Sequence, residues 1–366
     1  MFLNSTEAWR LLFTCAGIVA GFLFAAHRTD FKQKVPLFYC WLGAIAVLGG
    51  AAAFFLPIAV NSGFAKEDDG SALRQALLYT TGGLLGVITL GETHRKNNQE
   101  KEKNENDHIR QVHAERRSRY TKAIEQLANE KAAVRLGGIY TLVGLVDEWL
   151  ADESLTKDKQ KEEGQVIINN LCSYIRSPYL LADKREILAE ASSRNSNHVP
   201  YVGNIQEDRR DLYDEQGVRR AIFIEISNRI AKPFESGKKR ITEYSNAQQI
   251  WRNFKFDVSN SQIFYRLDGL YFGNIIFDGA IFYGTADFES SYFLEDIIFS
   301  FVRFEKDVNF KDSTFGGKLR FGHPNESLES VNFKGSTFNK SAYFEALSIL
   351  GEANFESSHF HGDTRF

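Results

Sequence analysis

Long runs without charged side chains alternate with charged segments over the first quarter of the chain. Three runs contain no Asp, Glu, Lys or Arg, and they cover residues 11–26, 35–65 and 75–91. A helix that crosses a membrane needs roughly 17–25 apolar residues, and Arg10 and Arg74 extend the two shorter runs if they reach the lipid headgroups. The pattern predicts a transmembrane region over residues 1–92 with three helices, at about 8–27, 36–60 and 74–92.

Charges around these runs predict the orientation in the membrane. The loop at 27–35 is mainly basic, the loop at 61–74 is mainly acidic, and basic residues return soon after residue 91. Because cytoplasmic loops carry an excess of Lys and Arg, we expect the N-terminus outside and the bulk of the chain in the cytoplasm. A secretory signal is the alternative for the first run, but Glu7 and Phe24 fit its basic start and its small-residue cleavage site poorly.

Two pairs of glycines lie within the apolar runs, Gly17 with Gly21 and Gly82 with Gly86. Glycines spaced by four residues make a flat helix face that lets a second helix approach closely. We expect these faces to pack the helices of one chain together, with dimerisation as the alternative.

A polar segment separates the apolar runs from the rest of the chain. Residues 93–108 contain no aliphatic or aromatic side chain, which predicts a polar helical stalk or linker over 93–118. After it, apolar residues recur with the helical period of 3.6 and predict an all-α domain over 119–247. The recurring positions are Ile124, Leu127, Ile139, Leu142, Val143, Val146, Trp149, Leu150, Ile167, Ile168, Leu171, Ile175, Val218, Ile222, Ile226 and Ile230.

Two of these helices align with one another. Val134-Arg135-Leu136-Gly137-Gly138-Ile139 matches Val218-Arg219-Arg220-Ala221-Ile222-Phe223 in the order of apolar, basic and small residues. The pattern resembles that of HEAT-type repeats, whose helix pairs stack on one another. We expect Arg135 and Arg219 to bond neighbouring turns or carboxylates rather than a ligand.

Aromatic residues recur through the last hundred residues at steps of mostly five and six. They occupy positions 272, 277, 282, 288, 293, 299, 304, 310, 315, 321, 333, 338, 344, 355, 360 and 366, with Leu328 and Ile349 in the missing places. A step of five rotates a helical side chain by about 140°, and an odd step along a strand reverses the face, so neither element keeps the rings together. A chain that turns a corner after each ring keeps all the rings on the same side. The spacing predicts a solenoid with the rings inside.

The repeated units resemble those of the pentapeptide-repeat family, A(D/N)Lxx. The clearest matches are Ala286-Asp287-Phe288, Val308-Asn309-Phe310, Val331-Asn332-Phe333 and Ala353-Asn354-Phe355. The resemblance covers roughly residues 267–366 and implies a right-handed quadrilateral β-helix over 248–366, although the alternating five and six differ from a strict five. Residues 119–127, 134–140 and 171–176 are similar to segments of bacterial membrane-anchored pentapeptide-repeat proteins, which implies a location in the bacterial inner membrane.

The two ends of such a solenoid need covering, because end strands expose unpaired backbone groups. We expect residues 248–256 to cap the first coil. Phe366 occupies a ring position at the other end. We expect that end to be covered by another copy of the chain or by a protein partner.

No arrangement of side chains predicts a reaction. Cys15, Cys40 and Cys172 lack disulfide-like or CxxC spacing, and no GxSxG, HExxH or Walker motif is present. His359 and His361 flank an inward ring and should point to solvent, while His108 and His113 are badly spaced for one metal. We expect a protein that is not an enzyme, with no catalytic, cofactor-binding or metal-binding residues and no cofactor.

The combined pattern favours a membrane-anchored scaffold whose β-helix binds a protein or a second copy. A membrane-perturbing effector or sensor, for example in phage defence, is the alternative from another functional class. A DNA mimic is a minor alternative, because Lys318, Arg320, Lys334 and Lys340 interrupt the acidic residues of the repeats. With 44 basic and 47 acidic residues in total, the chain has no overall charge that favours nucleic-acid binding.

Overall fold

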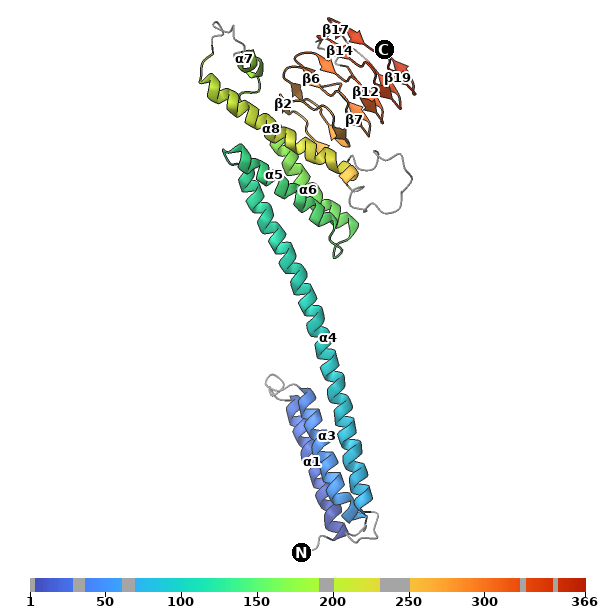
Figure 1. The fold of residues 1–366 in the computed structure, drawn as a ribbon. Helices are drawn as coiled ribbons and strands as arrows, with labels where there is room; N and C mark the ends of the chain where they lie inside the picture. The colour runs from blue at the N-terminus through green and yellow to red at the C-terminus, as the bar shows by residue number, and fades with distance from the viewer. Residues whose placement is uncertain are drawn as a thin grey trace. The chain divides into compact units, whose positions relative to one another are not determined.

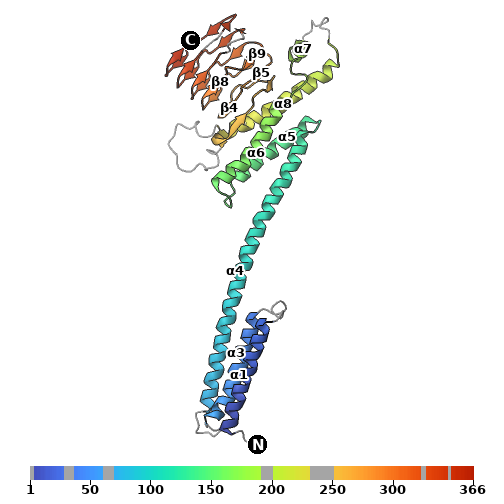
Figure 2. The same cartoon turned by 180° about the vertical axis from the view of Figure 1, so that it is seen from behind.

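The computed structural model describes residues 4–28, 37–60, 70–190, 201–230, 251–322, 327–344 and 348–366. The chain divides into two compact units, Met1–Arg110 and Gln111–Phe366. The first is helical, and the second combines helices with a coiled ribbon of short strands (Figures 1 and 2).

The N-terminal unit contains helices α1 (Ser5–Arg28) and α3 (Leu37–Ala59) and the first part of α4 (Gly70–Leu127). Both α1 and α3 are long and apolar enough to cross a membrane. A soluble core helix passes the same test but is mostly buried, whereas only 6% of the apolar window of α1 and 22% of that of α3 is buried. A signal sequence near the N-terminus passes it too, and low burial does not distinguish it from a membrane span. The described part of α4 is not among the helices apolar enough to cross a membrane, so a third span stays a prediction.

The close packing between these helices is not where the sequence predicted it. A Cβ atom added at Gly17, Gly21, Gly82 or Gly86 would meet no neighbouring atom within 4 Å in the part of the chain that the structure describes. The expectation that these faces pack the helices of one chain is therefore wrong. The close approach occurs instead at Gly49, where an added Cβ would lie 2.2 Å from Cγ2 of Thr81. The loops that carry the orientation argument, 29–36 and 61–69, lie outside the described residues.

The polar part of α4 is helical, and residues 93–108 are all exposed. Four more helices follow: α5 (Ala132–Leu150), α6 (Lys157–Arg176), α7 (Arg185–Glu190) and α8 (Ile205–Ile230). The predicted helical period is confirmed. All the apolar positions that define it are buried except Ile124, which is partly buried and packs against the core. Thr156 caps α6 by accepting a hydrogen bond from the Lys159 backbone N–H, a role typical of Thr at this position.

A short 3-10 helix, η1 (Trp251–Asn253), leads into the strands. The strands are β1 (Lys255–Asp257), β2 (Gln262–Ile263), β3 (Tyr271–Phe272), β4 (Asn274–Ile276), β5 (Ile281–Phe282), β6 (Ala286–Asp287), β7 (Tyr292–Phe293), β8 (Ile297–Ile298), β9 (Arg303–Phe304), β10 (Val308–Asn309), β11 (Thr314–Phe315), β12 (Leu319–Arg320), β13 (Ser327–Leu328), β14 (Val331–Asn332), β15 (Thr337–Phe338), β16 (Ala342–Tyr343), β17 (Ser348–Ile349), β18 (Ala353–Asn354), β19 (His359–Phe360) and β20 (Thr364–Arg365).

Strand pairing shows that the ribbon is a β-solenoid of about five turns. Every pair is parallel, and from β5 onward each pair joins strands that are four apart in the chain, as in the order β6, β10, β14 and β18. Val308 pairs with Ala286 on one side and with Val331 on the other, so equivalent residues are 22 or 23 positions apart. From β5 onward each coil therefore contributes four short strands, and hydrogen bonds between coils group the described strands into six sheets.

Phenylalanine rings fill the inside of the coils, as the spacing predicted. Phe288, Phe310, Phe333 and Phe355 form a stack with centroid separations of 5.1, 5.0 and 5.1 Å and interplanar angles of 12° or less. A second stack consists of Phe272, Phe293, Phe315, Phe338 and Phe360. Within these two stacks the rings of successive coils are nearly parallel, whereas Phe299 and Phe321, also one coil apart, meet edge to face at 69°. Stacked and edge-to-face pairs are the favoured aromatic geometries.

Serines between the rings explain how polar side chains fit inside. Ser313 and Ser336 are buried, and each hydroxyl donates to a backbone carbonyl of the preceding coil, Ser313 to Phe288 and Ser336 to Phe310, both at 2.7 Å. A hydroxyl buried without such a partner would be costly. Serine is thus a small interior residue that also ties two coils together.

One corner of each coil has a left-handed backbone. Ser290, Asp312, Gly335 and Ser357 occupy equivalent places in successive coils, with φ between 56° and 72°. This conformation turns the chain sharply and is easiest for Gly and for small polar residues. It supplies the bend that an inward ring at every fifth or sixth residue requires.

We expect the Phe310→Ala variant to lose about 3–5 kcal/mol of unfolding free energy, because Phe310 is fully buried and a cavity would replace its ring. The Phe310→Leu control should lose clearly less. A urea titration of the detergent-solubilised chain, with proteolytic detection of the unfolded solenoid, measures both. A loss below about 1 kcal/mol for the Ala variant would contradict a solenoid supported by its rings.

Candidate interaction surfaces

The first coil of the solenoid is covered by the helices. α6 contacts β1 and α8 contacts β3, and a single apolar core runs from α5 to the strands (Figures 1 and 2). Phe254 packs so closely on α6 that a Cβ atom at Gly164 would lie 2.6 Å from the ring. The predicted cap at 248–256 was thus only partly right: residues 251–256 belong to the joint, but helices form the cover, and 248–250 lie outside the described residues.

A buried arginine lies at the centre of this joint. Arg219 of α8 is 1% exposed, and its guanidinium pairs with Glu215 at 2.7 Å and donates to the carbonyl oxygens of Ile175 at 2.7 Å and Ser177 at 2.8 Å. These carbonyls end α6, where the helix dipole favours a positive charge. The guanidinium also lies 5.4 Å from the ring centroid of Phe264 in the first coil.

Glu215 is held by three partners. Besides Arg219, it pairs with Arg135 of α5 at 3.2 Å and accepts a hydrogen bond from the Tyr174 hydroxyl at 3.0 Å. Burial, followed by the nearby Glu215 charge, raises the pKa of Tyr174 above its usual range. The sequence-based expectation for Arg135 and Arg219 is confirmed, because both bond carboxylates and backbone carbonyls.

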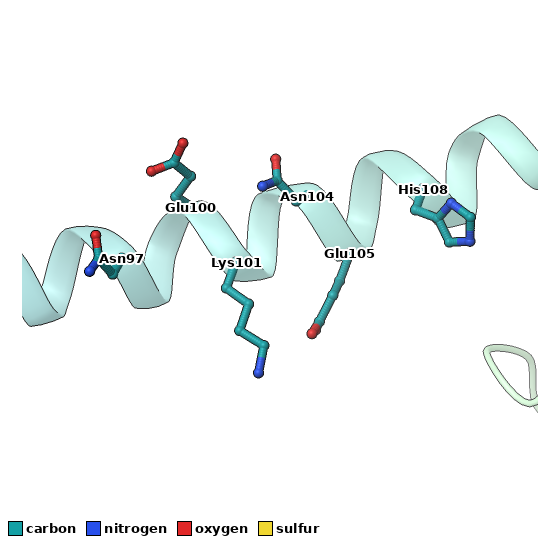
Figure 3. A pocket seen from close by; sticks show the side chains of 6 residues that line it. All are labelled: Asn97, Glu100, Lys101, Asn104, Glu105 and His108. Atoms are coloured by element: carbon teal, nitrogen blue, oxygen red, sulfur yellow. The ribbon is translucent and has the colours of Figure 1, made fainter.

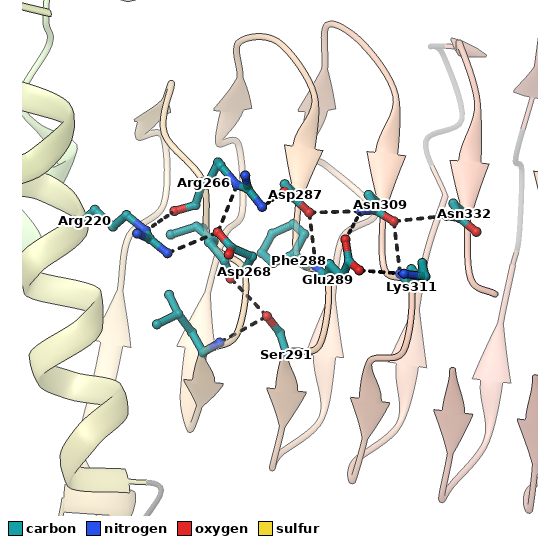
Figure 4. A network of polar contacts seen from close by, with 12 residues as sticks. Arg220, Arg266, Asp268, Asp287, Phe288, Glu289, Ser291, Asn309, Lys311 and Asn332 are labelled. Carbon is teal, nitrogen blue, oxygen red and sulfur yellow. Dashed lines mark hydrogen bonds and ion pairs between the residues drawn. The ribbon is translucent and has the colours of Figure 1, made fainter. Parts of the chain in front are cut away.

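A polar row links the helices to the outer surface of the coils (Figure 4). Arg220 of α8 contacts Asp268 at 3.1 Å, Arg266 contacts both Asp268 at 3.1 Å and Asp287 at 2.9 Å, and Asn309 continues the row by donating to Asp287 at 3.0 Å. Asn332 donates in turn to Asn309 at 3.2 Å. This is a ladder of side chains stacked along the solenoid, and its charges are largely paired.

The last coil that the structure describes, β17 to β20, is exposed. Strands β17 to β20 each have one edge unpaired among the described residues. Phe360 is 36% exposed and Phe366 is 78% exposed, whereas Phe338 and Phe344, one coil earlier, are at most 3% exposed. Exposed strand edges next to an apolar surface are typical sites of association.

The candidate metal residues do not come together. Within the described ranges no group of three or more His, Cys, Asp and Glu side chains is arranged to hold a metal. His359 and His361 are exposed on either side of the Phe360 backbone. His113 bonds Asp152 at 2.8 Å, and burial of Asp152 is outweighed by hydrogen bonds from Ser154, Arg116 and His113, which lower its pKa far below the usual range.

Other potentially reactive features are also explained by structure. Burial raises the pKa of Cys172 to about 12, so its thiol stays protonated and unreactive at neutral pH. The shallow hollow at Asn97, Glu100, Lys101, Asn104, Glu105 and His108 is the outer surface of α4 alone, and its side chains fan out along one helix (Figure 3). A surface formed by one exposed helix does not enclose a ligand.

A family model for pentapeptide repeats, with nine copies, matches residues 268–314. The C-terminal region therefore contains pentapeptide repeats folded as a β-solenoid. The same strand pairing continues beyond the match to β20. No curated protein and no solved structure matches the chain.

Sequence reasoning missed several residues of the joint. The alignment singled out Arg219, but nothing in it indicated that Arg220 joins Arg266 at Asp268, since Arg220 is 48 residues from Asp268 in the chain. The alternation of acidic and basic residues near 266–268 was the only available indication. Contacts of this kind depend on how the helices lie on the first coil.

We expect Arg219→Met to destabilise the chain by about 3–5 kcal/mol, because it leaves Glu215 buried with one cation fewer. Arg220→Met is the matched control: its pair with Asp268 is partly exposed, so the loss should stay within about 1 kcal/mol. Urea unfolding of the full chain measures both. Equal losses in the two variants would contradict the role given to Arg219.

Proposed function

We propose that the protein is a membrane-anchored, non-enzymatic scaffold whose solenoid serves protein–protein interaction or self-association. The pentapeptide repeats and the rigid ring stacks favour a structural or binding role. Two apolar helices, α1 and α3, are suited to anchor it. In this proposal the anchor lies in the bacterial inner membrane in several passes, with the N-terminus outside and the bulk of the chain cytoplasmic.

The finer architecture belongs to the same proposal. The β-helix is right-handed and quadrilateral in cross-section, and the helices α5 to α8 are related to HEAT-type repeats. The pairing of strands that are four apart in the chain supports the first assignment, and the aligned segments around Arg135 and Arg219 support the second. The solenoid is then a stiff rod with one end covered by the helices.

The observation that carries the proposal is the exposed coil formed by β17 to β20. Its ring residues, Phe360 and Phe366, are exposed beside unpaired strand edges among the described residues. A second copy of the chain presents the same rings and the same edges, so two such ends joined face to face would bury both sets. The proposed contact is therefore end to end, between two copies.

DNA mimicry is not favoured by the charges of the solenoid. The carboxylates of Asp287, Glu289 and Glu356 are each paired with a basic side chain. The hydrogen bond from Lys311 lowers the pKa of Glu289. A mimic of the DNA backbone requires an acidic surface that is not neutralised in this way.

We expect the full chain in detergent to form dimers that Phe366→Asp weakens at least tenfold, because the charge would be buried in the end-to-end contact. Phe301→Asp is the matched control, since Phe301 is also an exposed ring of the solenoid, at 61%, but lies away from the last coil. Mass photometry over a concentration series measures the dissociation constant. A monomeric parent protein, or equal weakening by both substitutions, would contradict the proposal.

Overexpression should leave the membrane potential unchanged, because a scaffold has no need to conduct ions. A potential-sensitive dye in cells that express the full chain tests this expectation. Depolarisation that requires residues 1–91 would favour the membrane-perturbing alternative instead.

A further inference from the structure

One outer face of the solenoid differs from the others in its charges. Strands β8, β12, β16 and β20 point Ile298, Arg320, Tyr343 and Arg365 outward at equivalent positions. Both arginines are exposed. This face is called the arginine face below and consists of these four residues.

The Tyr343 ring lies between the two arginines. The Arg320 guanidinium lies 5.9 Å from the ring centroid of Tyr343, and that of Arg365 lies 5.6 Å from it. Both distances are within the range of a cation–π contact. Because β16 lies between β12 and β20, the Tyr343 ring has one guanidinium on each side, and both arginine side chains are exposed.

Neither arginine has a carboxylate partner in the described part of the chain, and the same is true of Lys318 and Lys340 beside them. Several basic residues elsewhere on the solenoid are paired: Arg266, Arg303, Lys306, Lys311 and Lys334 each contact an Asp or Glu. Asp296 and Asp363 lie near this face, and Asp296 accepts from the Lys318 backbone N–H, but neither forms an ion pair with its cations. Four cations that have no carboxylate partner among the described residues, Arg320, Arg365, Lys318 and Lys340, therefore lie on or beside this face.

We propose that the arginine face binds an acidic peptide segment of a partner protein. Arg guanidinium groups recognise carboxylates through paired hydrogen bonds. The two arginines are two strand spacings apart, about 10 Å, which is close to the rise between residues seven apart on a helix. An acidic helix with carboxylates at such spacing matches both arginines at once.

The geometry favours a peptide over a single-stranded nucleic acid. Bases bind such proteins by stacking on the faces of aromatic rings. Both faces of Tyr343 are already covered by arginine, so this ring offers no stacking platform. The proposal deepens the scaffold role by naming a partner class, and it concerns a different surface from the end-to-end contact.

The test measures binding of a fluorescent helical peptide with Glu at positions seven apart to the full chain in detergent, at low and at physiological salt. We expect salt-sensitive binding that the double variant Arg320→Gln/Arg365→Gln weakens at least tenfold. The double variant Lys311→Gln/Lys334→Gln removes the same charge from another face and should bind within twofold of the parent. Tyr343→Phe should keep the affinity for the peptide and Tyr343→Ala should lower it, because the aromatic ring, and not the hydroxyl, positions the two arginines.

Three results would overturn this assignment. They are no binding of the acidic peptide by the parent protein, equal weakening by the two double variants, and tighter binding of an oligothymidine or of phosphatidylglycerol vesicles than of the peptide. Circular dichroism of each variant checks that the fold is retained. Mass photometry of the same samples reports the end-to-end contact separately, so failure of one proposal is distinguishable from failure of the other.

Discussion

The structure depends on the stacking of phenylalanine rings along the axis of the solenoid. Strands of two or three residues make few hydrogen bonds each and are not stable alone. Each buried ring contributes on the order of 1.5–3 kcal/mol, and it touches rings in its own coil and in the next. The short strands are held in register because their rings are stacked, and the outer residues are free to vary.

That constraint made the solenoid predictable from the sequence. Rings at steps of five and six exclude a helix and a continuous strand, and Leu328 and Ile349 fill the gaps as substitutes of similar character. The left-handed corners at Ser290 and Asp312 were harder to predict, because non-glycine residues adopt this backbone only when the surrounding fold requires it. The helices of the middle domain were equally predictable, because a helix that buries one face carries apolar residues with a period of 3.6.

The sequence was a poor guide to contacts between elements. The glycine faces at Gly17 and Gly82 suggested close packing that occurs instead at Gly49 and Thr81. A small residue permits close approach but does not choose its partner, which is set by the whole helix surface. The helices that cover the first coil were equally hard to predict, because α6 and α8 are distant in the chain from the strands that they contact.

The two candidate surfaces differ in how far the sequence alone could predict them. The end coil follows from the ladder itself, since any stack has ends, and it was expected from the sequence. The arginine face was not, because Arg320, Tyr343 and Arg365 are 22 or 23 positions apart and meet only when the coils are stacked. The number of residues in each coil must be known before a sequence can show which residues are stacked in this way.

Hydrogen exchange of the full chain, followed by mass spectrometry, tests the central claim most directly. If stacked rings stabilise the solenoid, amides in β6 to β12 should exchange slowest, with protection falling towards β19 and β20, where the rings are exposed. Fast exchange throughout β6 to β12, comparable with that of the exposed last coil, would contradict the account.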